Sequence, residues 1–297
     1  MNVFDRSVWL GVLVLMLVAS QALAEAATGE LRVMSFNIRN SNAKDGPNAW
    51  PLRREMMVRT IEAFDPDLLG VQECQPDQRD ALREALGEKY DWVGIPRDDG
   101  KARGEIAAVV FRRERFDKLR EGHFWLSETP DVVGSKGWDA AITRIVSWVE
   151  LKDRRREGDG KLFVFNTHFD HKGPQARLES AKLLRRRIGE ITREAPVIVT
   201  GDFNAREGSE PYRALLAGEM LYDTFPDVHK APTTQDFTFH GFTGKNEGGR
   251  RIDWVLRSRH FETISAGIDK TNEQGRYPSD HFPVTATLRW RASDTGE

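Results

Sequence analysis

The chain has 297 residues, with 44 lysines and arginines against 46 aspartates and glutamates, and a formal net charge of −2. This balance argues against a protein that binds long nucleic-acid duplexes mainly through their phosphates, because such proteins are strongly basic. The single cysteine, Cys74, excludes an intrachain disulfide. A chain of this length can bury a substantial core as one domain.

The first 24 residues have the pattern of a signal peptide. A short segment through Arg6 precedes the apolar stretch Val8–Ala19, and Ala22-Leu23-Ala24 stands before Glu25. An apolar stretch of about a dozen residues is short for a bilayer span, although a retained anchor is the alternative interpretation. We therefore expect cleavage after residue 24, a mature chain without a membrane anchor, and a periplasmic or secreted protein. One domain is expected over residues 29–292.

Runs rich in valine, isoleucine, phenylalanine and tryptophan predict strands along the whole mature chain. In chain order they are Leu31–Ile38, Leu68–Gln72, Ile106–Phe111, Ile142–Leu151, Leu162–His168, Val197–Thr200, Arg251–Leu256 and Phe282–Trp290. Apolar residues at helical spacing follow Pro51 and Pro174, which predicts two helices that begin at these prolines. Because strands outnumber helices, a purely alternating parallel sheet is disfavoured. We expect an α/β protein with two packed sheets and helices outside them.

Polar side chains stand at the ends of these runs. The most informative string is Gly201-Asp202-Phe203-Asn204, which follows an apolar strand and sets a carboxylate beside an amide. Such a pair suits a water molecule beside a metal-bound phosphate, although aspartate and asparagine also favour turns. The other strand ends supply Asn37, Glu73, His168, Asp253, Asp280 and His281.

Carboxylates and amides without cysteine ligands favour a hard cation, Mg²⁺ or Mn²⁺, over structural zinc. Each residue also has a simpler interpretation: Glu73 as a surface acid, Asp253 as a strand cap, and the histidines as hydrogen-bonded core residues. The ordered recurrence of the clusters argues against coincidence. The sequence has no Gly-x-Ser-x-Gly or P-loop motif, which favours direct attack by water.

From Leu31 to about Trp290, these motifs resemble the endonuclease/exonuclease/phosphatase superfamily, the deoxyribonuclease-I-like metal-dependent phosphoesterases. The chain is most similar to a bacterial exported branch, through Phe36-Asn37-Ile38-Arg39, Trp50-Pro51-Leu52-Arg53-Arg54 and Thr167-His168-Phe169-Asp170-His171. The resemblance implies a four-layer α-β-β-α sandwich with the active site at one edge of its two mixed sheets. It does not imply a substrate, because this fold serves nucleases, lipid phosphodiesterases and phosphatases.

The resemblance also implies a role for each residue. Metal binding would fall to Glu73 with Asn37 and Asp280, and Asp202 would activate the water that Asn204 positions. His168 and His281, the latter paired with Asp253, would bracket the phosphorus. Glu105 is similar to the acid that orients the first histidine, and Arg144 to an arginine that contacts the substrate phosphate, although both match only short strings and surface ion pairs are equally compatible with them.

Asp170 and His171 depart from the superfamily pattern, because they add an acid and a second imidazole after the Asn-Thr-His motif. They are candidates for a second metal or for substrate binding. A strand-to-helix loop capped by Asp170 is the simpler alternative.

We expect an exported, metal-dependent enzyme that uses activated water to hydrolyse a phosphate ester. A phosphodiester is the first expectation for the ester, and a monomer is expected for the protein. The alternatives are a sphingomyelinase-like lipid phosphodiesterase, an endonuclease, and a catalytically inactive binding module. The substrate is a small molecule or a nucleic acid. The scattered arginine runs favour a small or single-stranded phosphoester over long duplex DNA.

Overall fold

The computed structural model describes residues 29–156, 158–247 and 249–291. The predicted signal peptide, residues 1–24, lies outside the described residues, as does the last residue of the expected domain. Within the described ranges, no helix has both the length and the apolar character needed to cross a membrane.

Two six-stranded sheets form the centre of the molecule. The first sheet has the order β11-β12-β1-β2-β4-β3, with bounds Phe261–Ile268, Val284–Trp290, Glu30–Asn37, Leu68–Cys74, Ile106–Arg112 and Tyr90–Val93. The second has the order β5-β6-β7-β8-β10-β9, with bounds Phe116–Trp125, Ile145–Asp153, Lys161–His168, Val197–Asp202, Asp253–Arg257 and Tyr222–Asp223. Both sheets are mixed, because β1 and β2 pair in parallel, as do β7 and β8, among antiparallel neighbours.

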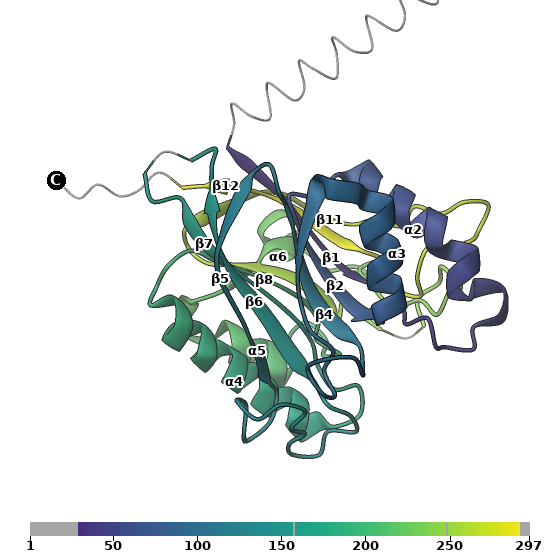
Figure 1. Cartoon of the computed structure of the whole chain (residues 1–297), viewed down its shortest axis with the longest axis horizontal. Helices are drawn as coiled ribbons and strands as arrows, with labels where there is room; N and C mark the ends of the chain where they lie inside the picture. Colours follow the sequence, from purple (N-terminus) through teal and green to yellow (C-terminus); the bar gives the residue numbers. More distant parts are fainter. Residues whose placement is uncertain (1–28, 157, 248, 292–297) are drawn as a thin grey trace, which may run out of the picture.

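The longer helices lie outside the two sheets, whereas the short helix Thr224–Val228 packs against β10 and β11, one strand of each sheet (Figure 1). The helices are α2 (Trp50–Phe64), α3 (Pro76–Leu86), α4 (Pro174–Thr192), α5 (Glu210–Leu216) and α6 (Thr224–Val228), with short 3-10 turns at Gly46–Asn48, Gly87–Lys89 and Ala217–Glu219. One apolar cluster joins α2 and α3 to the first sheet, and another joins α4 and α5 to the second. A third cluster fills the space between the sheets. The layers are therefore helix, sheet, sheet and helix, which confirms the predicted α-β-β-α sandwich.

A buried amide fixes one sheet against the other. Asn166 of β7 donates to the carbonyl oxygens of Val71 and Ala108 in the opposite sheet, at 2.8 and 2.9 Å. Its own oxygen accepts from Gln72 at 2.6 Å and from Thr200 at 3.0 Å. Because every polar atom of this amide has a partner across or within the sheets, Asn166 sets their relative register.

Candidate active site

Strand pairing gathers the predicted residues at one edge of the sandwich. The carboxyl ends of parallel strands meet at the same edge, so His168 of β7 lies opposite Asp202 of β8 in the pairing register. Asp253, the first residue of antiparallel β10, is the register partner of Asp202 on its other side. In the first sheet, Asn37 of β1 pairs with Gln72 of β2, one residue before Glu73.

Glu73 and Asn37 are in contact. The amide nitrogen of Asn37 donates to Glu73 Oε1 at 3.0 Å, and the backbone and side-chain nitrogens of Asn40 donate to Oε2 at 3.1 and 2.9 Å. Burial disfavours the charged carboxylate, but these hydrogen bonds, together with nearby His281, leave the pKa of Glu73 below its usual value. Glu73 is thus held ionised, in the state that a hard cation requires.

The backbone of Glu73 is unusual as well. Its φ is 60°, and the pairing of β2 with β4 shifts register between Val71 and Cys74. A bulge of this kind re-aims a side chain at the end of a strand. Positive φ values recur beside the site at Arg39 (53°) and Asn204 (46°), in keeping with the tendency of backbone strain to gather at functional sites.

Asp202 lies at the centre of the site. Its Oδ2 accepts from the Asn37 amide at 2.9 Å, and its Oδ1 accepts from the backbone nitrogen of Asn204 at 2.9 Å. Burial, followed by the charge of Asp253, raises the pKa of Asp202 to about 7. A carboxylate with this pKa is poised to take a proton near neutral pH.

The two histidines have different surroundings. His281 Nδ1 lies 2.9 Å from Asp253 Oδ2, and although burial opposes the charge, the carboxylates of Asp253 and Asp202 raise the pKa of His281 well above its usual value. His168 Nε2 lies 3.0 Å from the Asn204 amide nitrogen, and its Nδ1 has no hydrogen-bond partner among the described residues. Burial, followed by Arg144 and Arg97, places the pKa of His168 well below its usual value.

The two histidines expected to bracket the phosphorus are therefore not electrostatically equivalent. Of the two histidines, His281 alone hydrogen-bonds to a carboxylate, that of Asp253, and such a partner keeps a buried imidazole protonated. At neutral pH His281 is cationic and His168 is neutral. The distance to Asp202 Oδ2 is 3.8 Å from His281 Nε2 and 3.4 Å from His168 Nε2.

Glu105 lies beside His168 but does not hydrogen-bond to it. Both line a cavity of about 10 Å³, and the Glu105 carboxylate pairs with Arg97 instead. The predicted direct contact that would orient His168 is therefore absent. Arg97 competes successfully because its guanidinium carries a full positive charge, whereas His168 is neutral.

Asp170 caps the loop between β7 and α4, which agrees with the simpler of its two sequence-based interpretations. Its two oxygens accept from the backbone nitrogens of Ala141, Ile142, Lys172 and Gly173, at distances of 2.8 to 3.3 Å. Since four donors occupy this buried carboxylate, its assignment to substrate binding is corrected to that of a loop cap. His171 remains a candidate for substrate binding, because it is exposed and its Nδ1 lies 3.0 Å from Arg144 Nη2.

Asp280 is tied to the first sheet through two arginines. Arg39 Nε lies 3.6 Å from Asp280 Oδ2. The buried Arg53 guanidinium donates to the carbonyl oxygens of Ile38 and Pro278 at 2.6 and 2.9 Å, and also to those of Arg39 and Asn48. Arg53 thus joins the loop after Asn37 to the loop that carries Asp280 and His281, which explains structurally one arginine of the Trp50–Arg54 motif.

Sequence reasoning missed Asn40, Arg97 and the positioning role of Arg53. Asn40 follows the Asn37 motif by three residues and could have been found by asking which nearby donors reach Glu73. Arg97 lies in a loop without a repeating pattern and gave no signal.

Three of the described residues, Asp202, Asp253 and His281, carry ligand atoms that all lie within 4.8 Å of one another and could hold a metal ion. Glu73 and Asn37 adjoin this group through Asp202. The site as a whole is therefore a continuous acidic cluster with one cationic imidazole, a composition that fits a divalent cation.

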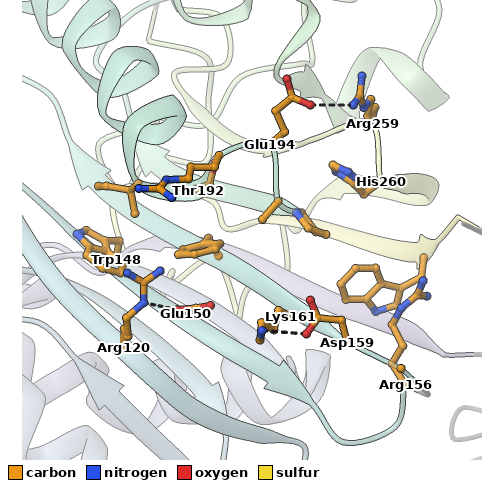
Figure 2. Close-up of a pocket in the computed structure, with 18 of the residues that line it drawn as sticks. Arg120, Trp148, Glu150, Arg156, Asp159, Lys161, Thr192, Glu194, Arg259 and His260 are labelled. Atoms are coloured by element: carbon orange, nitrogen blue, oxygen red, sulfur yellow. Dashed lines mark hydrogen bonds and ion pairs between the residues drawn. The ribbon is translucent and has the colours of Figure 1, made fainter.

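A wider hollow than the cavity beside His168 lies elsewhere among the described residues. Its volume is about 1400 Å³. Trp148, Lys161 and Arg259 are among the residues that line it (Figure 2). Its charged groups are largely paired, as in the contacts of Arg120 with Glu150 and of Arg259 with Glu194. None of the predicted catalytic residues lines it.

Comparison with known proteins agrees with this geometry. Residues 34–281 match the Endonuclease/Exonuclease/phosphatase family. The chain belongs to this family. It is therefore an enzyme, a hydrolase of phosphoester bonds.

Solved structures with the same fold include two proteins of Bacteroides thetaiotaomicron, each 35% identical to this family member. One is an endonuclease/exonuclease/phosphatase family protein that covers 89% of this chain and 98% of its own, with a TM-score of 0.81. The other is a mannosyl-6-phosphatase, and the match covers 88% of this chain and 100% of the phosphatase chain, with a TM-score of 0.79. Among curated relatives, nocturnin of Rattus norvegicus is 23% identical over 85% of this chain, which spans 63% of the length of nocturnin.

Proposed function

We propose that this chain is a divalent-metal-dependent phosphatase that hydrolyses small phosphorylated compounds, sugar phosphates among them, by attack of water. The observation that carries the proposal is the contiguous arrangement of half-buried, ionised Glu73 with two buried groups, Asp202 with its pKa of about 7 and cationic His281. The similarity to a mannosyl-6-phosphatase over the full length of that protein supports a sugar phosphate as substrate. This choice replaces the initial expectation of a phosphodiester with a monoester.

Glu73, Asn37 and Asp280 would hold the metal. Burial raises the pKa of Asp280, and the neighbouring Glu73 adds to this effect, so a cation between them would relieve the crowding of carboxylates. The group formed by Asp202, Asp253 and His281 is less suited to bind the metal, because His281 Nδ1 and Asp253 Oδ2 already hydrogen-bond to each other. Oxygen ligands favour Mg²⁺ or Mn²⁺, and such an ion, when bound, neutralises negative charge on the phosphate oxygens.

The side chains of this chain supply the remaining steps. Asp202 accepts a proton from the attacking water, and its Oδ1 is fixed by the backbone of Asn204. His281, kept protonated by Asp253, donates a hydrogen bond to the phosphate as negative charge accumulates in the transition state. As the P–O bond to water forms, the ester P–O bond breaks, and the departing alcohol takes its proton from solvent. Neutral His168, which the Asn204 amide contacts, lies 3.4 Å from Asp202 Oδ2 through its Nε2 atom.

A substrate panel tests this proposal. The purified enzyme, stripped with a chelator, is supplied with Mg²⁺ or Mn²⁺ and offered mannose 6-phosphate, a nucleotide, a phosphodiester, plasmid DNA and sphingomyelin vesicles at matched salt. We expect metal-dependent release of inorganic phosphate from the small monoesters at the highest rate. Salt-sensitive nicking of plasmid with little activity on small substrates would instead identify a nuclease, and preferred cleavage of sphingomyelin would identify a lipid phosphodiesterase.

We further propose that the protein is exported after cleavage behind Ala24. The support is the short apolar stretch followed by Ala22-Leu23-Ala24. Mass spectrometry of the protein from its native cells should find an amino terminus at Glu25. An intact amino terminus in the cytoplasmic fraction would contradict this proposal.

A further inference from the structure

Phe239 is an exposed aromatic residue held against His281. Its side chain is 39% exposed, whereas Thr238 and His240 on either side are fully buried. This alternation is that of an extended segment with one face turned outward. The Phe239 and His281 rings meet edge to face, with 5.2 Å between their centroids.

The segment around Phe239 is anchored to both members of the His281–Asp253 pair. Phe239 and His281 form an antiparallel bridge, and the Phe282 nitrogen donates to the Thr238 carbonyl oxygen at 2.8 Å. The Thr238 hydroxyl accepts from the backbone nitrogen of Asp253 at 3.3 Å.

His240 secures the other side of the segment. Its backbone nitrogen donates to the Asp280 carbonyl oxygen at 2.9 Å, and its ring stacks on Phe282 with 3.9 Å between centroids. The exposed phenyl ring is thus fixed in place before any ligand arrives, so that contact with it costs little ordering of the protein.

Phe239 has no role in the chemistry described above. Among the large apolar side chains that are exposed in the described part of the chain, it is the only aromatic one. Single exposed apolar residues are common and need no function. This one differs because its ring contacts the ring of His281, the residue proposed to donate a hydrogen bond to the phosphate.

We propose that Phe239 contacts the alcohol portion of the substrate and selects phosphate esters whose alcohol is a sugar ring. The inference rests on the proposed function and adds to it the residue that recognises the leaving group. A phosphate bound beside His281 brings the first carbon atoms of its ester group next to the exposed phenyl ring. The C–H face of a pyranose can cover such a ring from one side, and the burial of both apolar surfaces favours binding.

The test compares two substrates that share the phosphate but differ in the alcohol, mannose 6-phosphate and methyl phosphate. In Phe239→Ala, kcat/KM for mannose 6-phosphate should fall about tenfold relative to that for methyl phosphate, while Phe239→Trp should retain the preference. Leu119→Ala, which removes a side chain of similar exposure (42%) on β5, should leave the ratio unchanged. The inhibition constant of inorganic phosphate should be the same in all variants.

Equal losses on both substrates would overturn the inference, because they would show that Phe239 only supports His281. A selective loss on a nucleoside monophosphate, with the sugar phosphate unaffected, would overturn the assignment of a sugar ring. Calorimetric binding of mannose 6-phosphate and of inorganic phosphate in the presence of Mn²⁺, with Asp202→Asn as the background that lacks the proton acceptor, gives the same comparison with turnover suppressed. Absence of all hydrolysis in the wild type would contradict the proposed function, whereas an unchanged binding ratio in Phe239→Ala would contradict the role of Phe239.

Discussion

His281 Nδ1 lies 2.9 Å from Asp253 Oδ2, and this contact distinguishes His281 from His168, whose Nδ1 has no hydrogen-bond partner in the described part of the chain. One imidazole is thereby kept cationic and the other neutral within the same site. The placement of charge follows from strand pairing, since Asp253 and Asp202 are register partners on β10 and β8. The fold therefore assigns different protonation states to two residues of the same type.

We predict that Asp253→Asn lowers kcat by about 10²-fold, the scale for loss of a group that stabilises transition-state charge. The carboxylate raises the pKa of His281, so the active protonated form is lost as the pH rises through that pKa. Without the carboxylate this pKa falls, and the alkaline limb of the pH–kcat profile should move to lower pH. An unshifted limb would show that Asp253 does not set the charge of His281. The metal affinity of Asp253→Asn should be unchanged. A large loss of metal affinity would instead identify Asp253 as a metal ligand.

Asp170 should contribute stability that depends on pH. Burial opposes its charge, but four backbone hydrogen bonds lower its pKa from 3.8 to about 2, worth about 2 kcal/mol of unfolding free energy at neutral pH. This stabilisation is present above about pH 4 and is lost as the pH falls towards the folded pKa of about 2. The difference in unfolding free energy between wild type and Asp170→Asn should therefore shrink in acid. An equal difference at pH 7 and pH 3 would contradict this account, and exposed Asp159→Asn serves as the control.

Asn166→Leu should destabilise the fold by about 2–4 kcal/mol, because the change strands the buried carbonyl oxygens of Val71 and Ala108 and the amide of Gln72. Urea denaturation monitored by tryptophan fluorescence measures this loss. Ser265→Ala, on the exposed edge strand β11, should change stability by no more than about 0.5 kcal/mol. A similarly small effect of Asn166→Leu would refute the view that Asn166 sets the register between the sheets.

Arg53→Lys should weaken metal binding by about tenfold or more, the scale for loss of a group that orients metal ligands. A lysine ammonium cannot reach the four carbonyl oxygens that the guanidinium contacts in the two loops. Exposed Arg54→Lys, the next residue of the same helix, is the matched control. Calorimetric titration with Mn²⁺ would contradict this role if both variants bound the metal as the wild type does.

Much of the site could be predicted because its residues follow apolar runs that end at one edge of the sheets. Asn37, Glu73, His168 and Asp202 all stand at such ends, where short motifs are visible in sequence. The partner of Glu105, and the Ala141 and Ile142 donors to Asp170, could not be predicted in the same way, because they depend on how separate loops meet. Arg97 reaches Glu105 from within a loop that has no periodic pattern.

The central strands of the fold could be predicted from the sequence, whereas several edge strands could not. The central strands are continuous apolar runs, but β5 exposes Lys118, Leu119, Arg120 and Glu121 in its middle, and its pattern resembles a loop. Edge strand β11 is likewise mostly exposed, and β9 has only two residues. The contact between Gln72 and Asn166 spans 94 residues and arises from packing of the sheets, which no local pattern encodes.

A divalent metal bound through Glu73 is required for hydrolysis under the proposed function, and this requirement can be tested directly. Its most direct test is the rate of phosphate release from mannose 6-phosphate against Mg²⁺ concentration, after removal of metal, for the wild type, Glu73→Gln and exposed Glu84→Gln. We predict no activity without metal, recovery in the wild type and Glu84→Gln, and a requirement for at least about tenfold more Mg²⁺ in Glu73→Gln. Full activity in the presence of chelator, or the same Mg²⁺ dependence in all three proteins, would contradict this requirement.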